Sequence, residues 1–166
     1  MIPLILRLKK AAHKEMAKLQ DILVNTLYEV FNDAVIHGGT SIWRCYNGNR
    51  FSEDIDVYIS RDLKKVSLLF ERLQKKGLII EKKKISERSI FSVIRHDRIV
   101  VRFEAIFKKV NGILKEYETA ESNFITIYTL TPGFARKLIV NTIYVITLIC
   151  SGQIFGFKPI TPSLNI

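Results

Sequence analysis

One stretch, residues 37–59, limits what the rest of the chain can build around it. It opens with the pair Gly38-Gly39 and ends in an alternating run that contains Asp54 and Asp56. Adjacent glycines let a backbone approach phosphate closely, and the amide groups at a following helix start attract anions. Carboxylates two positions apart on a strand point to the same face, where they can hold a hard cation. The stretch therefore predicts a site for a metal–nucleoside triphosphate.

The hydrophobic pattern around this stretch predicts an α+β fold. Apolar residues recur at helical spacing in some segments and alternate in others. We expect helices at 9–31, 40–46 and 62–76, and strands at 34–37, 55–59, 78–85, 89–94, 99–107 and 124–130. Thr40 or Ser41 is expected to cap the short helix, and residues 113–123 show no clear pattern. This order predicts a mixed sheet with helices packed on one face.

The C-terminal part of the chain is set apart by its pattern. Thr131-Pro132 is a typical helix start, and the helix is expected to end near Ser151-Gly152. The tail that follows has no periodicity. We therefore divide the chain into a catalytic domain, residues 1–130, and a short C-terminal helical segment with an irregular tail, residues 131–166.

Charge and cysteine content limit the partners and the compartment. The chain has 26 Lys+Arg against 16 Asp+Glu, a formal net charge of +10. Such an excess favours nucleic acid or the phosphates of a small ligand, although a basic solvated surface has the same balance. The two cysteines have no CxxC spacing, so they predict neither a disulfide framework nor a zinc site. The apolar run 138–150 is too short to span a bilayer, and we expect a cytoplasmic protein.

A third carboxylate is expected close to the aspartate pair. Glu104 is the acidic residue of the predicted strand 99–107, where it shares the polar face with Arg102. Three carboxylates on neighbouring strands would complete a metal site of the two-metal type. The alternative to a metal site is that Asp54 and Asp56 are an ordinary solvated pair on a strand edge.

The segment HGGTSIWRCYNGNRFSEDIDVYI resembles the signature of the DNA polymerase β-like nucleotidyltransferase superfamily. In that superfamily a glycine-containing pair precedes an acid–x–acid strand. The wording GGTS…RFSEDID is similar to AbiEii-type nucleotidyltransferases, which include toxins of bacterial type IV toxin–antitoxin systems. The likeness extends over about residues 20–140. It implies Mg²⁺- or Mn²⁺-dependent transfer of a nucleoside monophosphate from a triphosphate to an acceptor hydroxyl.

The resemblance also implies a role for each matching residue. The implied metal ligands and catalytic residues are Asp54, Asp56 and Glu104, the last acting on the attacking hydroxyl through metal or as a base. The implied nucleotide-binding residues are Gly38, Gly39, Thr40, Ser41, Arg50, Ser52 and Lys137. Plainer alternatives stay open: a salt bridge from Arg50 to Glu53 or Asp54, and a solvated helix face for Lys137.

Two features depart from the family pattern. Arg136 stands where relatives commonly have an acidic residue, and residues 151–166 lack the longer helical region of those relatives. The pattern is that of a truncation or a frame change, which leaves the apolar helix 138–150 without partners; a homodimer through it or a disordered tail is expected to cover it.

Several functions follow from these observations. The leading hypothesis is a nucleotidyltransferase whose acceptor is RNA such as tRNA, or a protein, with a cognate antitoxin as a further expected partner. The alternative is a truncated, non-catalytic module of the same fold that binds nucleotide or RNA. A drug-modifying nucleotidyltransferase ranks last, because a net charge of +10 repels cationic drugs.

Overall fold

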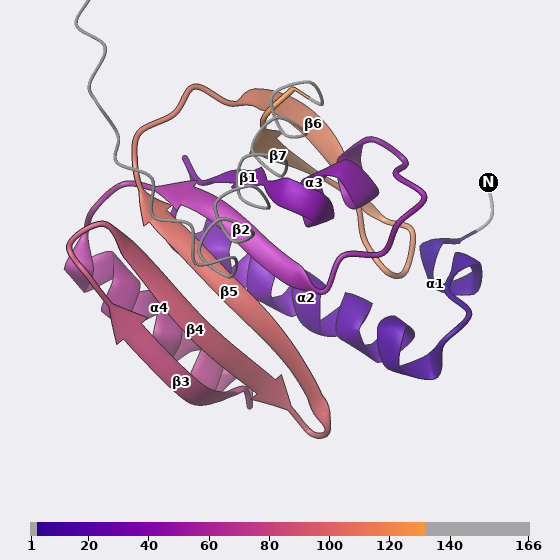
Figure 1. Cartoon of the computed structure of the whole chain (residues 1–166), viewed down its shortest axis with the longest axis horizontal. Coiled ribbons are helices and arrows are strands. Elements are labelled where there is room, and N and C mark those ends of the chain that lie inside the picture. The colour runs from indigo at the N-terminus through magenta and orange to yellow at the C-terminus, as the bar shows by residue number, and fades with distance from the viewer. Residues whose placement is uncertain (1–2, 132–166) are drawn as a thin grey trace, which may run out of the picture.

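The described part of the chain is an α+β domain. The structure, a computed structural model, describes residues 3–131 (Figure 1). The helices are α1 (Leu4–Arg7), α2 (Ala11–Val30), α3 (Gly38–Cys45) and α4 (Leu63–Lys75). The strands are β1 (Val35–His37), β2 (Asp54–Ile59), β3 (Ile79–Ile85), β4 (Ser89–His96), β5 (Ile99–Phe107), β6 (Ile113–Glu118) and β7 (Phe124–Thr129). The predicted fold class is confirmed.

All of these strands belong to one mixed sheet. Its order is β3-β4-β5-β2-β1-β7-β6. Strand β2 runs antiparallel to β1 and parallel to β5, and β1 runs parallel to β7. The register places His37 opposite Asp56, and Asp56 opposite Glu104. Residues from three separate parts of the chain therefore meet in one row across the middle of the sheet.

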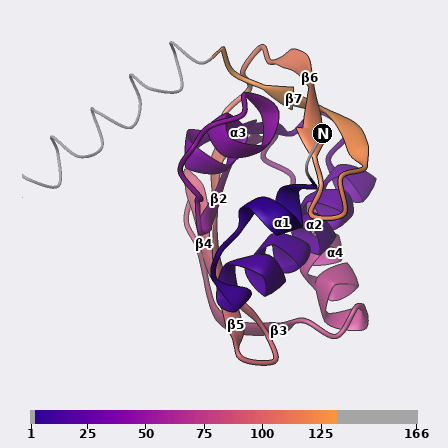
Figure 2. The ribbon, with the colours of Figure 1, turned by 90° about the vertical axis from the view of Figure 1, so that its right-hand side faces the viewer.

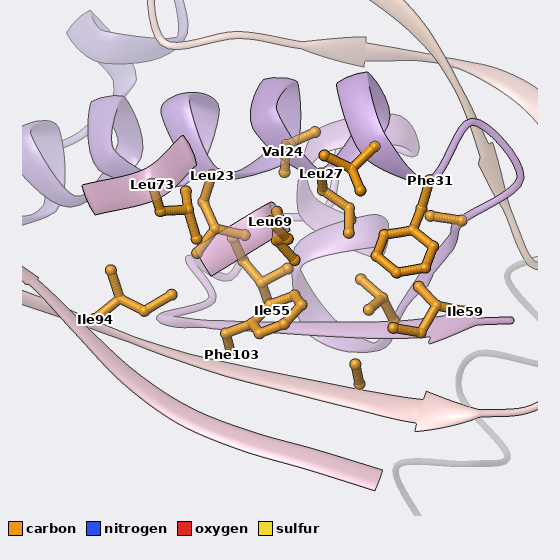
Figure 3. Packing of buried hydrophobic residues seen from close by; sticks show 14 of the residues in the cluster. Leu23, Val24, Leu27, Phe31, Ile55, Ile59, Leu69, Leu73, Ile94 and Phe103 are labelled. Atoms are coloured by element: carbon orange, nitrogen blue, oxygen red, sulfur yellow. The ribbon is translucent and has the colours of Figure 1, made fainter. Parts of the chain in front are cut away.

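The hydrophobic core lies between the sheet and helices α2 and α4. Figure 2 shows both helices on the same side of the strands. Figure 3 shows Leu27 of α2, Phe31 directly after that helix and Leu69 of α4 packed over Ile55 and Phe103 of the sheet; all five side chains are buried. Burying a side chain of this size contributes about 1.5–3 kcal/mol, so this layer holds the domain together.

Helix α4 begins and ends where the sequence predicts. The Oδ1 atom of Asp62 accepts hydrogen bonds from the backbone N–H groups of Lys64 and Lys65, both at 3.0 Å. Gly77 follows the helix with φ +84, a conformation that glycine adopts without strain. These local signals fix the connection between β2 and β3.

Three local expectations were wrong. Helix α3 begins at Gly38, and no side chain caps it, so neither Thr40 nor Ser41 is its N-cap. Helix α1 and strand β6 were not predicted. In β6 the first four residues are exposed and only Tyr117 and Glu118 are buried, so the sequence shows no alternation there.

Some expectations fall beyond the described residues. They concern the helix from Thr131-Pro132 to residue 150, the tail 151–166, the basic residues Arg136 and Lys137, and a dimer through the apolar helix. The domain division at residue 130 likewise stays a prediction. Among the helices of residues 3–131, none combines the length and apolar character needed to cross a bilayer.

Candidate active site

Three acidic side chains form a carboxylate row on the sheet face opposite the core. Asp54 and Asp56 alternate along β2 with the buried residue Ile55. Glu104 lies on β5, directly paired with Asp56, and is exposed. Paired residues on neighbouring strands project to the same face. The structure thus places on one face of the sheet the three residues that the sequence predicts as metal ligands.

The carboxylate row concentrates negative charge in a partly buried place. Burial, the largest cause, and the neighbouring Glu104 and Asp54 carboxylates together raise the pKa of Asp56 to about 7, against the opposing effect of Arg102. A carboxyl group that is hard to ionise among other carboxylates is typical of a site that binds a cation or moves a proton.

Arg102 on β5 holds Asp54 in a two-point ion pair. Its Nε atom lies 2.7 Å from Oδ1 of Asp54, and its Nη2 atom lies 2.7 Å from Oδ2. The hydrogen bonds and the charge of Asp54 raise the pKa of Arg102. Arg50, for which a salt bridge to Glu53 or Asp54 is the alternative, is exposed and makes no ion pair within residues 3–131.

The donor chemistry of the carboxylate row suits a hard divalent cation, although the side chains do not yet converge. Over residues 3–131, no three His, Cys, Asp or Glu side chains are close enough together to hold a metal ion. The reason is visible at Asp54, both of whose oxygens face Arg102. Mg²⁺ prefers one or two carboxylates plus substrate phosphates, and Asp56 and Glu104 supply such oxygens.

The glycine pair lies against the carboxylate row. Gly38 has φ +71, and a Cβ atom added there would collide with the carboxylate of Asp56. A Cβ atom on Gly39 would come within 2.7 Å of the Ser52 hydroxyl. Only glycine fits at the first position, and the start of α3 is thereby kept close to the carboxylates. Amide groups at a helix start suit phosphate.

Thr40 and Ser41 serve the fold through their side chains. Both are fully buried. The Thr40 hydroxyl donates to the backbone oxygen of Asp54, and the Ser41 hydroxyl shares a hydrogen bond with that of Thr129. Their hydroxyls are therefore not presented to a nucleotide, and α3 can meet phosphate only through its backbone and its glycines.

A buried network of hydrogen bonds and an ion pair lies behind the site, and the sequence pattern does not predict it. The amide of Gln20 donates to the Ser52 backbone oxygen at 2.8 Å, and its own oxygen lies 3.3 Å from Nη2 of Arg44. That guanidinium is 3.3 Å from Asp21, whose pKa is raised by burial against the effect of Arg44. The network ties α2 and α3 to the segment that leads into Asp54.

Ser52 sits at the junction of these groups. Its hydroxyl is 3.5 Å from the backbone oxygen of Asp54, a weak contact, and makes no bond to the carboxylates.

No periodic signal could have revealed Gln20 or Arg44, because each is a polar residue on an amphipathic helix and looks like a surface residue.

His37 closes the row on the β1 side. It is buried, and its ring stacks on Tyr58 with centroids 4.2 Å apart. Burial lowers the pKa of His37 to about 4, so the imidazole next to Asp56 is neutral. Within residues 3–131 its Nε2 atom has no hydrogen-bond partner.

A family model decides which group of proteins this chain falls into. The model for "Nucleotidyl transferase AbiEii toxin, Type IV TA system" matches residues 21–129. The chain belongs to this family. The match covers the glycine pair and the carboxylate row, and it bears out the resemblance seen in the sequence. No curated protein sequence matches the chain.

Two solved structures share the AbiEii-family fold of this domain. One is a crystal structure of a candidate nucleotidyltransferase from H. pylori, with TM-score 0.54 and 16% identity over 80% of this chain and 58% of the other. The second is JHP933 from Helicobacter pylori, with TM-score 0.53 and 15% identity over 80% of this chain and 56% of the other. At these identities the likeness shows the fold. The chain spans less than two thirds of either structure.

Proposed function

We propose that this chain is a nucleotidyltransferase that transfers a nucleoside monophosphate from a triphosphate to an acceptor hydroxyl, with Mg²⁺ or Mn²⁺ as cofactor. The observation that carries the proposal is the close approach of Gly38 to the Asp56 carboxylate, beside Glu104. It puts a phosphate-compatible backbone and a cation-compatible set of oxygens in one place. Membership of a family of nucleotidyl transferase toxins supports this reading.

The residues divide the work of transfer. The backbone at Gly38 and Gly39 accommodates the phosphates, and exposed Arg50 neutralises part of their charge. The acceptor oxygen attacks the α-phosphorus, the bond to the β-phosphate oxygen breaks, and pyrophosphate leaves. Glu104, exposed on β5, takes the proton of the attacking hydroxyl. When bound by Asp54, Asp56 and Glu104, the metal would offset the negative charge that develops on the phosphates.

Other parts of the proposal rest on the sequence. Lys137 is proposed as a further triphosphate contact, on its place in the family pattern. The acceptor is proposed to be RNA, tRNA included, because the chain has a net charge of +10; a protein acceptor is the other candidate. A cognate antitoxin is expected from the family description.

Label transfer tests the proposal directly. The protein is incubated with Mg²⁺, each triphosphate labelled at its α-phosphate, and either total RNA or total protein as acceptor. We expect Asp56→Asn to lower transfer at least about 100-fold, as loss of a charged group at a reacting centre does. Asp97→Asn is the matched control, because its side chain is 87% exposed in the β4–β5 hairpin and it should leave transfer intact. Equal transfer by wild type and Asp56→Asn would remove the carboxylate row from the mechanism.

A non-catalytic binding module of the same fold is the second candidate. The observation in its favour is the Arg102 ion pair, which occupies both oxygens of Asp54. Binding of a triphosphate without label transfer to any acceptor would select this reading over the enzyme. Titration calorimetry with each triphosphate measures the binding, and the label-transfer assay on the same protein then separates the two.

A further inference from the structure

A hollow outside the carboxylate row lies between the N-terminal helices and the loop that joins α3 to β2. Its volume is about 410 Å³. The side chains that matter for its chemistry are Lys9, Lys10, His13, Trp43 and Phe51. We call it the N-terminal hollow. Nothing in the proposed transfer step uses these residues.

Three aromatic rings contact one another in succession in the N-terminal hollow. Trp43, which is buried, meets the Phe51 ring edge-on at 4.7 Å between centroids. The His13 ring then lies on Phe51 at 4.3 Å, with only 7° between their planes. His13 and Phe51 are both half-buried, so the stack reaches solvent. A flat ring from a ligand can extend such a stack.

The rim of the N-terminal hollow is positively charged. Lys9 and Lys10 are exposed and make no ion pair within the part of the chain that the structure describes. Of the other charged groups nearby, Arg7 pairs with Glu118, and the exposed Glu53 carboxylate lies 3.8 Å from the His13 ring. Two unpaired lysines beside an aromatic stack match the backbone and the bases of one strand of nucleic acid.

The N-terminal hollow is also close to the carboxylate row along the chain. Phe51 precedes Asp54 by three positions, and three extended residues reach at most roughly 10 Å. That is about the span of one or two nucleotides. Exposed Arg50 directly precedes Phe51 in the chain. A strand whose end reaches the carboxylate row can therefore rest its next base on the aromatic stack.

We propose that the N-terminal hollow binds single-stranded RNA next to its reacting end, with a base that extends the His13–Phe51 stack and phosphates at Lys9 and Lys10. Stacking requires an unpaired base, which a duplex does not offer. An acidic protein surface would match the lysines but would leave the aromatic stack unused. The inference rests on the proposed function for its choice of RNA, because the hydroxyl of an RNA end is the proposed acceptor.

Trp43 provides the readout, because it is the single tryptophan of the sequence. Its fluorescence is followed while a 12-nucleotide oligo(A) or oligo(U) RNA is added at low salt. We expect quenching that saturates, with weaker binding by an RNA duplex of equal charge and by inorganic polyphosphate. Equal binding of polyphosphate or of the duplex would overturn the role of stacking. Absence of any saturable RNA binding would overturn the inference as a whole.

Matched lysine variants separate a built site from general attraction. Lys9→Ala/Lys10→Ala removes two charges at the N-terminal hollow, and Lys82→Ala/Lys83→Ala removes two exposed charges from β3. We expect the first pair to weaken RNA binding about tenfold and to reduce the salt slope by about 1.4, since each phosphate contact contributes about 0.7 for a single strand. We expect less than a threefold change in the second pair. Equal effects in both pairs would show attraction without a site.

A Phe51→Leu variant tests the stack itself. It keeps an apolar side chain over Trp43 while removing the ring, and thermal unfolding checks that the fold is retained. We expect about tenfold weaker RNA binding, as loss of one base–aromatic contact does. A well-folded Phe51→Leu protein with wild-type RNA affinity would overturn the proposed stacking.

Failure of this inference can be told apart from failure of the proposed function. Triphosphate binding with Mg²⁺ is measured in wild type and in Lys9→Ala/Lys10→Ala, whose lysines lie outside the carboxylate row. Intact triphosphate binding and transfer with RNA affinity independent of the two lysines would end the inference and leave the function standing. RNA binding that depends on the lysines, in a protein that binds no triphosphate, would do the reverse.

Discussion

Strands β2 and β5 each have a helix-covered face and an open face, and the two faces differ in what they contribute. On the covered face, Ile55 and Phe103 are both 0% exposed and pack under α2 and α4. On the open face lie Asp56 and Glu104, whose negative charges repel one another. The period of two in a strand therefore separates stability from chemistry within a few ångströms. Substitutions on the covered face should lower stability. Substitutions of the carboxylates on the open face should weaken binding and raise stability.

The largest expected effect on folding comes from the covered face. Phe103→Ala removes a fully buried ring, and we expect it to lower the free energy of unfolding by about 3–5 kcal/mol in urea denaturation. Val100→Ala is the matched control on the same strand, because Val100 is 37% exposed. It should cost less than about 1 kcal/mol. Similar losses at both positions would mean that the covered face is not the main source of stability.

The open face should behave in the opposite way. The pKa of Asp56 is raised from 3.8 to about 7. The folded state therefore favours the protonated carboxyl, and this contribution to stability is present below pH 4 and is lost as the pH rises through about 7. The negative charges of Glu104 and Asp54 disfavour ionisation of Asp56, and the positive charge of Arg102 favours it. Neutral His37 is paired with Asp56 on the neighbouring strand.

Asp56→Asn should remove this loss. In EDTA, we expect Asp56→Asn to match the wild-type unfolding midpoint near pH 4 and to exceed it near pH 8, by the equivalent of about 2–4 kcal/mol. Thermal unfolding of both proteins across that range is the measurement. A variant that is less stable than wild type at pH 8 would contradict the view of the open face as a cost to folding.

Gly38 joins the two comparisons, since it is a backbone position that faces the carboxylate row. Gly38→Ala introduces both a positive-φ strain and a collision with Asp56, and we expect a loss of about 1–3 kcal/mol together with loss of triphosphate binding. Gly77→Ala is the matched control, because Gly77 has φ +84 but nothing within 4 Å of the added Cβ. It should lose about 1 kcal/mol and keep triphosphate binding. Equal behaviour of the two variants would reduce the role of Gly38 to a turn.

The smallest effect is expected at the exposed ion pair. Arg102 is 57% exposed and Asp54 is 34% exposed, and pairs of this kind contribute roughly 0–1 kcal/mol. We expect Arg102→Gln to change the free energy of unfolding by less than about 1 kcal/mol. Because the variant releases Asp54, Mg²⁺ should bind more tightly in titration calorimetry. Weaker Mg²⁺ binding would indicate that Arg102 supports the site instead of competing for it.

Much of the domain could be predicted from local sequence signals. Alternation along Ile55, Val57 and Ile59, and the Asp62 and Gly77 ends of α4, depend on neighbouring residues alone. The carboxylate row followed from alternation together with the family resemblance. These signals work because strand period and helix ends are set by residues close in the chain.

What escaped prediction depends on residues far apart in the chain. Arg44 is 2% exposed only because Gln20, Asp21 and the backbone of Glu118 surround it in three dimensions. The sequence predicts Thr40 as a phosphate contact, but its hydroxyl donates a hydrogen bond to the backbone oxygen of Asp54. The pairing of Asp54 with Arg102 requires the parallel β2–β5 register, which no local pattern specifies.

The antiparallel pairing of β1 with β2 has a consequence for variation among chains of this kind. Gly38 stays beside Asp56 because His37 pairs with Asp56, and the length of the intervening loop does not set that distance. Residues 47–49, which lie outside that pairing, can therefore change in number while the glycine and the carboxylate keep their separation. Surface loops tolerate such changes at little thermodynamic cost. The loop that borders the N-terminal hollow is thus free to diversify, while the glycine and the carboxylate keep a fixed geometry.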